Sequence, residues 1–510
     1  MADYSKVRTI ITQDAEVDDQ NSLRHFLLCS NEVELQGIVQ TSSKFHWIGV
    51  PGAVKPEKKY KDDFESEIPI ESGDYDKPYR WPGTDWMWRV IDDYEKDYPN
   101  LIKHAEGYPI PDYLRSITKV GNIGYEGERE NPSDGSELIR ERILDDDPRK
   151  LYLQVWGGCN TIARALMDIQ SEYEGTDEWD ALHAKISDKV IITACGEQDP
   201  VYREYIAEEW PGIVFVKTLQ MESYAYPWYM MPESESKDTL KCDFMKSEIL
   251  NGKSALANDY CTWSDGHYYE GETDDNQFGT NLDLAENWFG ARIFGLPAAK
   301  KYDFLSEGDS PTFFILFDKG FRTLEDFSYG GYAGRYYKKD EVNSKGEPLN
   351  VWDVCKDSFT GYDGETKEIE SMWPYVADIQ RDFAARVEWA SADTFEKGEH
   401  RPSLSITGGT DRTAAPGETV MLHAEAASPD GSDLRISWRI YPEISTCDAE
   451  LVYGSEYEIE GEKSPAEHGA IGVVISQNAK PGDKVHVIVK AQANGHHKLT
   501  YYQQVIITVK

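Results

Sequence analysis

The alternation of short β-branched runs with amphipathic helical stretches, from residue 1 to about 390, most constrains how this chain can fold. The first unit predicts a buried strand at residues 7–12, a helix at 18–30 and a second strand at 34–41. Successive strands joined by helices are typical of an α/β fold, in which helices cover a largely parallel sheet. The sequence therefore predicts an α/β domain over residues 1–390.

Further units follow the same order along this domain. Their pattern predicts strands at 151–156, 189–194 and 213–216, and helices at 160–169, 202–209, 282–294 and 375–389. Residues 221–279 lack this periodicity and are rich in aromatic, Ser, Asp and Gly residues, so we expect long loops there. Loops of this length are usually functional or disordered, and the aromatic content favours an ordered rim around an active site.

The pattern changes after a polar stretch at residues 391–400, which we interpret as an inter-domain linker. From Ser403 onward, short alternating runs are separated by turns that contain Pro and Gly. About seven strands in roughly 100 residues predict an immunoglobulin-like β-sandwich, with Trp438 as its core aromatic residue. We therefore expect a second domain at residues 403–510, with a stabilising or adhesive role.

The charge of the chain limits the ligands it can bind. The net charge is −39, from 92 acidic and 53 basic residues. This excess repels nucleic acid and anionic membranes, and it favours a neutral, cationic or metal-bridged ligand. The same excess also fits an acidic surface that keeps the protein soluble.

The cysteines and the apolar segments set further limits. The seven cysteines are an odd number and lack C-x-x-C spacing, so neither a disulfide framework nor a cysteine zinc site is indicated. No stretch reaches the roughly 20 apolar residues of a membrane helix, and the polar first six residues lack the apolar core of a signal peptide. A soluble protein is expected on these grounds.

An acidic motif occupies the turn between the first strand and the first helix. It reads Asp14-Ala15-Glu16-Val17-Asp18-Asp19 and holds four carboxylates in six residues. In doubly wound folds, ligands bind at the carboxyl ends of strands, where this turn opens. Clustered carboxylates favour a shared hard cation such as calcium or magnesium. The alternative is a solvated acidic loop in which Asp18 or Asp19 caps the helix.

The order of strand, D-x-x-x-D-D and helix resembles the opening of nucleoside hydrolases, which usually read D-x-D-P-x-x-D-D. By position, the resemblance implies that Asp14 binds calcium (Ca²⁺) and deprotonates the attacking water. Asp18 would hold the sugar hydroxyls, and Asp19 would be the bidentate calcium ligand. The sequence departs from the family at Thr12, where the first aspartate is usual, and at Ala15, where proline is usual.

Two later segments resemble the same family. Residues 151–161 are similar to its T-G-x-x-x-N segment, which implies that Trp156 offers a backbone carbonyl to calcium and that Asn160, one place early, contacts substrate. A tight strand-to-helix turn is the alternative. Asp309 stands where the family has its last calcium ligand, although Gly308 replaces the histidine that protonates the leaving group. A solvated turn is the alternative there.

Because that histidine is absent, another group would have to assist the departing group in any hydrolysis. The candidates lie in predicted loops. They are His46, His267, Glu270, Glu307 and Tyr224. Each of them also has an ordinary interpretation as a surface or packing residue.

The wider order of segments is similar to a family of bacterial and fungal proteins described as cellulose-binding. The segments that carry this similarity are 9–12, 18–23, 41–43 with 45–47, 134–139, 156–158, 307–311 and 382–386. The resemblance implies a nucleoside-hydrolase-like, mostly parallel sheet flanked by helices, followed by an immunoglobulin-like β-sandwich. It also adds His46 and Trp47 to Asp18 and Asn160 as residues expected to contact the sugar.

The resemblance thus implies a calcium-dependent hydrolase of glycosyl bonds, with Asp14 as the base and Asp14, Asp19, Asp309 and the Trp156 carbonyl as metal ligands. A non-catalytic carbohydrate-binding protein that keeps the metal and the sugar clamp is the first alternative. A nucleoside N-ribohydrolase is the second. The expected partner is a carbohydrate or glycoside, and the expected location is extracellular or periplasmic, with the cytoplasm as the alternative.

Overall fold

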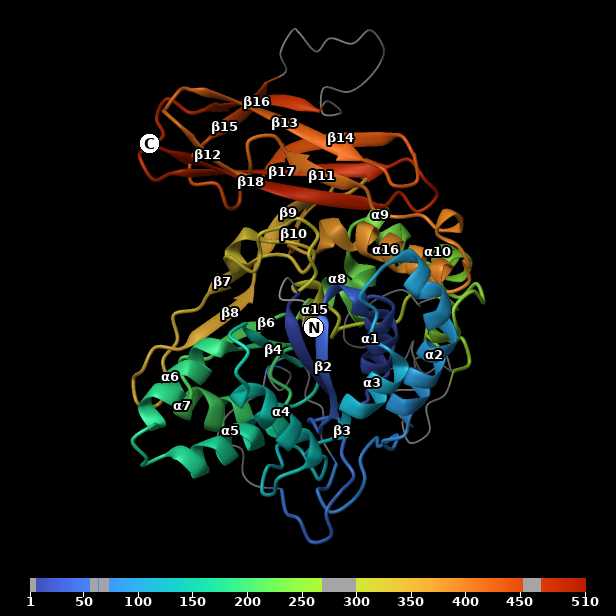
Figure 1. Ribbon diagram of the computed structural model, residues 1–510, viewed down its shortest axis with the longest axis vertical. Helices are drawn as coiled ribbons and strands as arrows, with labels where there is room; N and C mark the ends of the chain where they lie inside the picture. Colours follow the sequence, from blue (N-terminus) through green and yellow to red (C-terminus); the bar gives the residue numbers. More distant parts are fainter. Residues whose placement is uncertain (1–5, 56–62, 64–72, 268–299, 453–468) are drawn as a thin grey trace.

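The computed structural model describes residues 6–55, 63, 73–267, 300–452 and 469–510 (Figure 1). The helix expected at residues 282–294 and the candidate Glu270 lie outside these ranges. Within them, no helix has both the length and the apolar character that crossing a bilayer requires.

The first part of the chain is built on an eight-stranded sheet with the order β3-β2-β1-β4-β5-β6-β8-β7. Every neighbouring pair is parallel except β7 and β8. The strands are β1 (Arg8–Gln13), β2 (Glu34–Gln40), β3 (Thr118–Val120), β4 (Leu151–Val155), β5 (Val190–Ala194), β6 (Val214–Lys217), β7 (Tyr336–Lys338) and β8 (Asn350–Val354). The order reverses between β1 and β4, and at such a switch point the carboxyl ends of the strands border a crevice.

Helices cover both faces of this sheet, as the buried central strands require. Helices α4 (Asp134–Leu144), α5 (Asn160–Tyr173) and α6 (Trp179–Lys189) share a core with Ile10. Helices on the other face share a core with Ile11, the next residue along β1. They include α1 (Val17–Leu28), α2 (Trp86–His104), α3 (Pro111–Ile117) and α16 (Val376–Trp389). Ile10 and Ile11 thus pack into the cores on opposite faces of the sheet, because successive side chains of a strand point to opposite faces.

Most expected elements are present, and the differences have physical reasons. Helix α1 begins at Val17 with Glu16 at the N-cap position, so the expected cap at Asp18 or Asp19 is wrong. Those two aspartates lie in the first turn, where the positive end of the helix dipole stabilises carboxylates. The helix expected at 202–209 is a π-helical turn, Tyr202–Ile206, followed by the short helix α7 (Ala207–Glu209).

The long loops expected at residues 221–279 are instead a series of single helical turns over the part that the structure describes. They are α8 (Met221–Tyr224), η3 (Tyr226–Met230), α9 (Glu235–Asp238), α10 (Cys242–Phe244), η4 (Met245–Ile249) and α11 (Ala255–Asn258). Each turn is too short to give a periodic pattern, yet several of them bury side chains in the core, among them Tyr224, Met245 and Leu256.

The second part is a β-sandwich, as expected, made of two four-stranded sheets with the orders β11-β13-β16-β15 and β12-β18-β17-β14. Its strands are β11 (Ser403–Ile406), β12 (Asp411–Ala414), β13 (Thr419–Ala427), β14 (Leu434–Ile440), β15 (Ala449–Val452), β16 (Ala470–Ile475), β17 (Lys484–Ala493) and β18 (Thr500–Val509). Leu422, Val473 and Val487 are fully buried between the sheets, and Trp438 lies in the same core.

The sandwich packs directly on the first part of the chain, beside the hairpin of β9 (Lys356–Thr360) and β10 (Thr366–Glu370) and helix α16 (Figure 1). The Lys490 ammonium lies 2.8 Å from a carboxylate oxygen of Asp378 in α16. Tyr441 donates a hydrogen bond of 2.6 Å to Asp357 in β9. These buried polar contacts fix the sandwich against the α/β layer.

Candidate active site

The candidate site lies at the carboxyl ends of β1, β2, β4 and β5, where the first residues after each strand converge. Ala15 has a φ of +75°, a left-handed conformation that is uncommon for a residue with a Cβ. This turn places the backbone N–H of Asp14 3.0 Å from Oδ1 of Asp19, to which it donates a hydrogen bond. Strained backbone of this kind clusters at functional sites.

The structure brings one distant acidic residue, Asp309, to the carboxylates of the loop after β1. Glu16, Asp18 and Asp19 hold carboxylate oxygens within 4.8 Å of one another. Asp309 arrives from a distant loop and interacts electrostatically with Asp14, Asp18 and Asp19. Gly308 permits this approach, because a Cβ there would lie 3.0 Å from Oδ2 of Asp18. All four aspartates are buried. We call Asp14, Asp18, Asp19 and Asp309 the aspartate cluster.

Burial and mutual repulsion raise the pKa of two members of the cluster, Asp19 and Asp309. Burial raises the pKa of Asp19, and the charges of Asp309, Asp14 and Asp18 raise it further. The pKa of Asp309 is raised by burial and then by its acidic neighbours. Burial would also raise the pKa of Asp14, but the positive charge of His46 and hydrogen bonds from His46 and Ser43 lower it. The cluster therefore holds more carboxylates than the positive charge of His46 can offset.

The kind of ligand atom in this cluster, the carboxylate oxygen, suits a hard divalent cation. Oxygen ligands from carboxylates suit calcium and magnesium. Oδ2 of Asp309 is buried and has no hydrogen-bond partner among the described residues, which is unusual for a buried acceptor. A cation among Asp14, Asp19 and Asp309 would supply both the missing charge and the missing partner.

The Trp156 carbonyl, the fourth expected ligand, follows β4 directly beside β1. The Trp156 N–H donates to the carbonyl of Thr12 at 2.9 Å. The next residue, Gly157, packs against Asp14, because a Cβ there would lie 2.7 Å from the Cβ of Asp14. The Trp156 carbonyl accepts a hydrogen bond from the side-chain amide of Gln198. Gln198 was not singled out in the sequence, although it lies in the loop after β5, at the same edge of the sheet as Asp14.

The residues expected to contact the sugar have different surroundings in the structure. His46 is buried beside the cluster, with Nδ1 3.4 Å from Oδ2 of Asp14. Trp47 is also fully buried, and its ring packs against Tyr75 and Tyr79 at centroid distances of 5.4 and 4.7 Å. Its indole N–H donates to the carbonyl of Lys77 at 3.0 Å. The Trp47 ring thus belongs to an aromatic core rather than to an open platform.

Asn160 begins helix α5 and uses its side-chain amide within the protein. The amide donates to Oγ of Ser42 at 2.9 Å and to the carbonyls of Asn122 and Glu128 at 2.9 and 2.8 Å. Its oxygen accepts a hydrogen bond from Thr41. Through these hydrogen bonds, Asn160 connects the loops that follow β2 and β3 to the start of α5.

The candidate acids are also held in defined surroundings. Glu307 is fully buried, and its carboxylate lies 2.9 Å from Nδ1 of His25 and accepts hydrogen bonds from Tyr260 and Ser310. Burial alone would lower the pKa of His25, but the charge of Glu307 raises it to about 9. Glu307 therefore serves as the acceptor of a buried ion pair. His25 was not singled out in the sequence, since one histidine in a helix carries no signal.

Two further candidate acids, Tyr224 and His267, have different surroundings from Glu307. Tyr224 is buried, and burial raises the pKa of its hydroxyl well above the usual value. His267 is partly exposed, and the hydrogen bond to Asp265 raises its pKa. Nδ1 of His267 lies 3.0 Å from Oδ2 of Asp265. Tyr224 is thus held in its neutral form, and His267 is paired with its neighbour.

Comparisons with known proteins cover both parts of the chain. The family model described as "Cellulose-binding Sde182, nucleoside hydrolase-like domain" matches residues 8–336. The model "Cellulose-binding protein Sde0182, C-terminal domain" matches residues 419–509. A solved structure of a nucleoside hydrolase-related hypothetical protein from Saccharophagus degradans, associated with carbohydrate metabolism, has a TM-score of 0.67 at 23% identity. The match covers 99% of this chain and 100% of that one. No curated protein matches significantly.

Proposed function

The chain belongs to the family of cellulose-binding Sde182 proteins, and from this membership we propose that it binds cellulose or a related glucan without cleaving it. The observation that carries the proposal is that both matched models, one over the sheet and one over the sandwich, have a cellulose-binding description. An acidic chain suits this ligand, because a neutral glucan is not repelled by the net charge of −39.

The family descriptions correct our expectation of a calcium-dependent hydrolase of glycosyl bonds, which was wrong. The first domain is nucleoside hydrolase-like in its fold, whereas the printed family description is one of binding. This favours the non-catalytic alternative. The surroundings of the cluster agree with the correction, because Gly308 offers no proton and the neighbouring Glu307 is committed to His25.

Within this proposal, the aspartate cluster holds a calcium ion through Asp14, Asp19, Asp309 and the Trp156 carbonyl. The partnerless oxygen of Asp309 and the crowding of buried carboxylates support the assignment. The bound ion would supply a positive charge that polarises and orients sugar hydroxyls. Asp18, whose Oδ2 accepts a hydrogen bond of 3.2 Å from Ser306, would accept a hydrogen bond from the sugar beside the ion.

A retention assay on insoluble cellulose tests the binding proposal. We expect the purified chain to be depleted from solution by microcrystalline cellulose, with no reducing sugar released. The Asp18→Asn variant should bind at least about tenfold more weakly, since one charge-assisted hydrogen bond contributes about 1.5–3 kcal/mol. The exposed Asp177 provides the matched control, and Asp177→Asn should bind like the unchanged protein.

Two results would contradict this proposal. One is an absence of retention on cellulose at any calcium concentration. The other is release of soluble sugar by the unchanged protein that the Asp14→Asn variant does not show. Binding to an insoluble cell-wall polymer also implies an extracytoplasmic protein, and fractionation of the source cells tests that part.

A further inference from the structure

A second cluster of possible metal ligands lies at the junction of the two parts of the chain, away from the aspartate cluster. It begins at the tip of the hairpin between β17 and β18, where His496 and His497 are adjacent. Glu399, from the linker, accepts hydrogen bonds from both of their backbone N–H groups, at 2.6 and 2.9 Å. Gly495 allows this contact, because a Cβ there would lie 2.4 Å from the Glu399 carboxylate. The hairpin tip is thus docked in a fixed position.

The first domain presents Glu248 to the two imidazoles. Glu248 lies in the π-helical turn η4, and such turns are frequent at functional sites. Its Oε2 lies 3.0 Å from Nε2 of His496 and 4.0 Å from Nδ1 of His497. Its Oε1 accepts a hydrogen bond of 2.9 Å from Ser247. One carboxylate oxygen and two ring nitrogens therefore converge within 4.8 Å of one another.

The other nitrogen of His497 has a partner of its own. Its Nε2 lies 2.9 Å from Oε2 of Glu388, at the end of helix α16. The same carboxylate accepts a hydrogen bond of 3.1 Å from the Lys253 ammonium, and a carboxylate paired with an ammonium accepts hydrogen bonds rather than donating them. In a neutral ring, the proton therefore sits on Nε2, and Nδ1 presents a lone pair toward Glu248. A carboxylate that orients an imidazole in this way is a common feature around protein-bound zinc.

The local charges favour a cation at this point. Three carboxylates surround the histidines, those of Glu248, Glu388 and Glu399. One ammonium offsets them, that of Lys253, which lies 3.1 Å from Oε1 of Glu388. With neutral imidazoles, two negative charges remain, and a divalent ion would balance them.

The spacing of the ligand atoms suits zinc. A tetrahedral ion with bonds of about 2.0–2.1 Å separates its ligand atoms by about 3.3 Å. The separations of 3.0 and 4.0 Å in the cluster bracket this value. Two nitrogens and one oxygen also match a borderline transition metal better than calcium. The set of three leaves a fourth position for water.

We propose that Glu248, His496 and His497 bind one Zn²⁺ ion, with Glu388 as a positioning residue for His497. Because Glu248 comes from the first domain and the histidines from the sandwich, the ion fastens the two domains together. The site goes beyond carbohydrate binding and does not depend on it.

Zinc titration of the untagged, chelator-treated full-length protein tests the proposal. We expect the unchanged protein to bind one equivalent of Zn²⁺ by calorimetry. His496→Ala and Glu248→Gln should weaken this equivalent at least about 100-fold, since each removes one of three ligands. Glu388→Ala should weaken it about 10- to 100-fold. The matched control is His423→Ala, which alters an exposed histidine of β13 and should leave binding intact.

A spectroscopic measurement distinguishes this site from the aspartate cluster. With Cu²⁺ as the probe, pulsed electron paramagnetic resonance should show nitrogen modulation from two imidazoles, and from one in His496→Ala. Cellulose retention should be unchanged in every variant at this site. The proposal is overturned if no zinc equivalent binds, if His423→Ala loses it equally, or if the copper signal lacks imidazole nitrogen. In each of those cases the four side chains form only an ion-pair cluster.

Discussion

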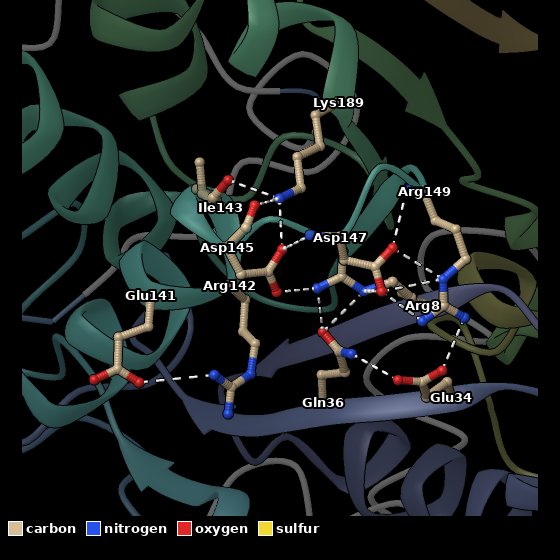
Figure 2. A network of polar contacts seen from close by, with 10 residues as sticks. All are labelled: Arg8, Glu34, Gln36, Glu141, Arg142, Ile143, Asp145, Asp147, Arg149 and Lys189. Atoms are coloured by element: carbon tan, nitrogen blue, oxygen red, sulfur yellow. Dashed lines mark hydrogen bonds and ion pairs between the residues drawn. The ribbon is translucent and has the colours of Figure 1, made fainter. Parts of the chain in front are cut away.

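The two ends of strand β1 bury charge in opposite ways. At its amino end, the Arg8 guanidinium is fully buried against Asp145 and donates to Gln36 at 2.8 Å. The ion pairs of this network join three basic residues, Arg8, Arg149 and Lys189, to three acidic ones, Glu34, Asp145 and Asp147 (Figure 2). Opposite charges are therefore balanced at this end.

At the carboxyl end of the same strand, like charges gather. Asp14 follows β1 directly and meets Asp18, Asp19 and Asp309, and His46 is the basic side chain that faces Asp14. The effect on the acids is opposite at the two ends. A hydrogen bond from Arg149 lowers the pKa of Asp147 to about 2, whereas burial and neighbouring carboxylates raise the pKa of Asp309.

This difference separates a balanced structural network from the cluster that we propose as the binding site. A balanced network holds β1, β2 and the turn after α4 together and leaves no charge for a ligand. An unbalanced cluster opposes folding, so its retention indicates a binding role. Strand β1 thus carries balanced ion pairs at its amino end and the proposed ligand-binding carboxylates at its carboxyl end.

The largest effect is expected at the balanced end. Arg8→Ala removes a fully buried guanidinium from Asp145, Asp147 and Gln36 and should lower the free energy of unfolding by about 3 kcal/mol, measured by urea denaturation. Arg142→Ala is the control in the same region (Figure 2), because Arg142 and Glu141 are 3.8 Å apart and partly exposed. That variant should change stability by less than about 0.5 kcal/mol. Equal effects of the two changes would contradict a structural role for the Arg8 network.

Calcium should stabilise the protein through the unbalanced end. At about 100 times its dissociation constant, the ion should raise the free energy of unfolding by about 2.7 kcal/mol. Asp309→Asn should lose this response in thermal unfolding with and without calcium. Asp147→Asn, at the balanced end, should keep it. A calcium response that persists in Asp309→Asn would place the ion elsewhere.

Without calcium, the same two substitutions should act with opposite signs. In a chelator, Asp309→Asn removes one buried like charge and should raise the free energy of unfolding by about 1 kcal/mol. Asp147→Asn removes a paired charge and should lower it by a similar amount. Denaturant titration of both variants at pH 7 measures the difference. The comparison fails if Asp309→Asn is the less stable of the two.

The smallest effect concerns acid. The lowered pKa of Asp147 contributes stability that is fully present above its ordinary pKa of about 3.9 and is lost as pH falls through about 2. Arg149→Ala removes the hydrogen bonds to Asp147 and should cost about 1 kcal/mol at pH 7. The gap to the unchanged protein should stay constant from pH 7 to 5 and shrink between pH 4 and 2. If the difference in the free energy of unfolding widened toward pH 2, the pH dependence would have to come from a group other than Asp147.

The sequence by itself determined the elements and the main chemical motif. Apolar periodicity located β1, α1 and the strands of the sandwich, because burial leaves a local pattern of period 2 or 3.6. The buried Trp438 confirms the expected core residue of the second domain. The acidic motif after β1 also needed no tertiary information, since four of its carboxylates lie within six residues.

Only the tertiary structure decided which distant residues meet. The packing of the loops places Asp309 near Asp14 and Gln198 beside Trp156, and it buries Trp47 and the amide of Asn160 among their own neighbours. The meeting of Glu248 with the β17–β18 hairpin likewise depends on how the two domains pack. Such contacts join residues far apart in the chain, and no local propensity or periodicity records them, because they arise from the packing of whole elements.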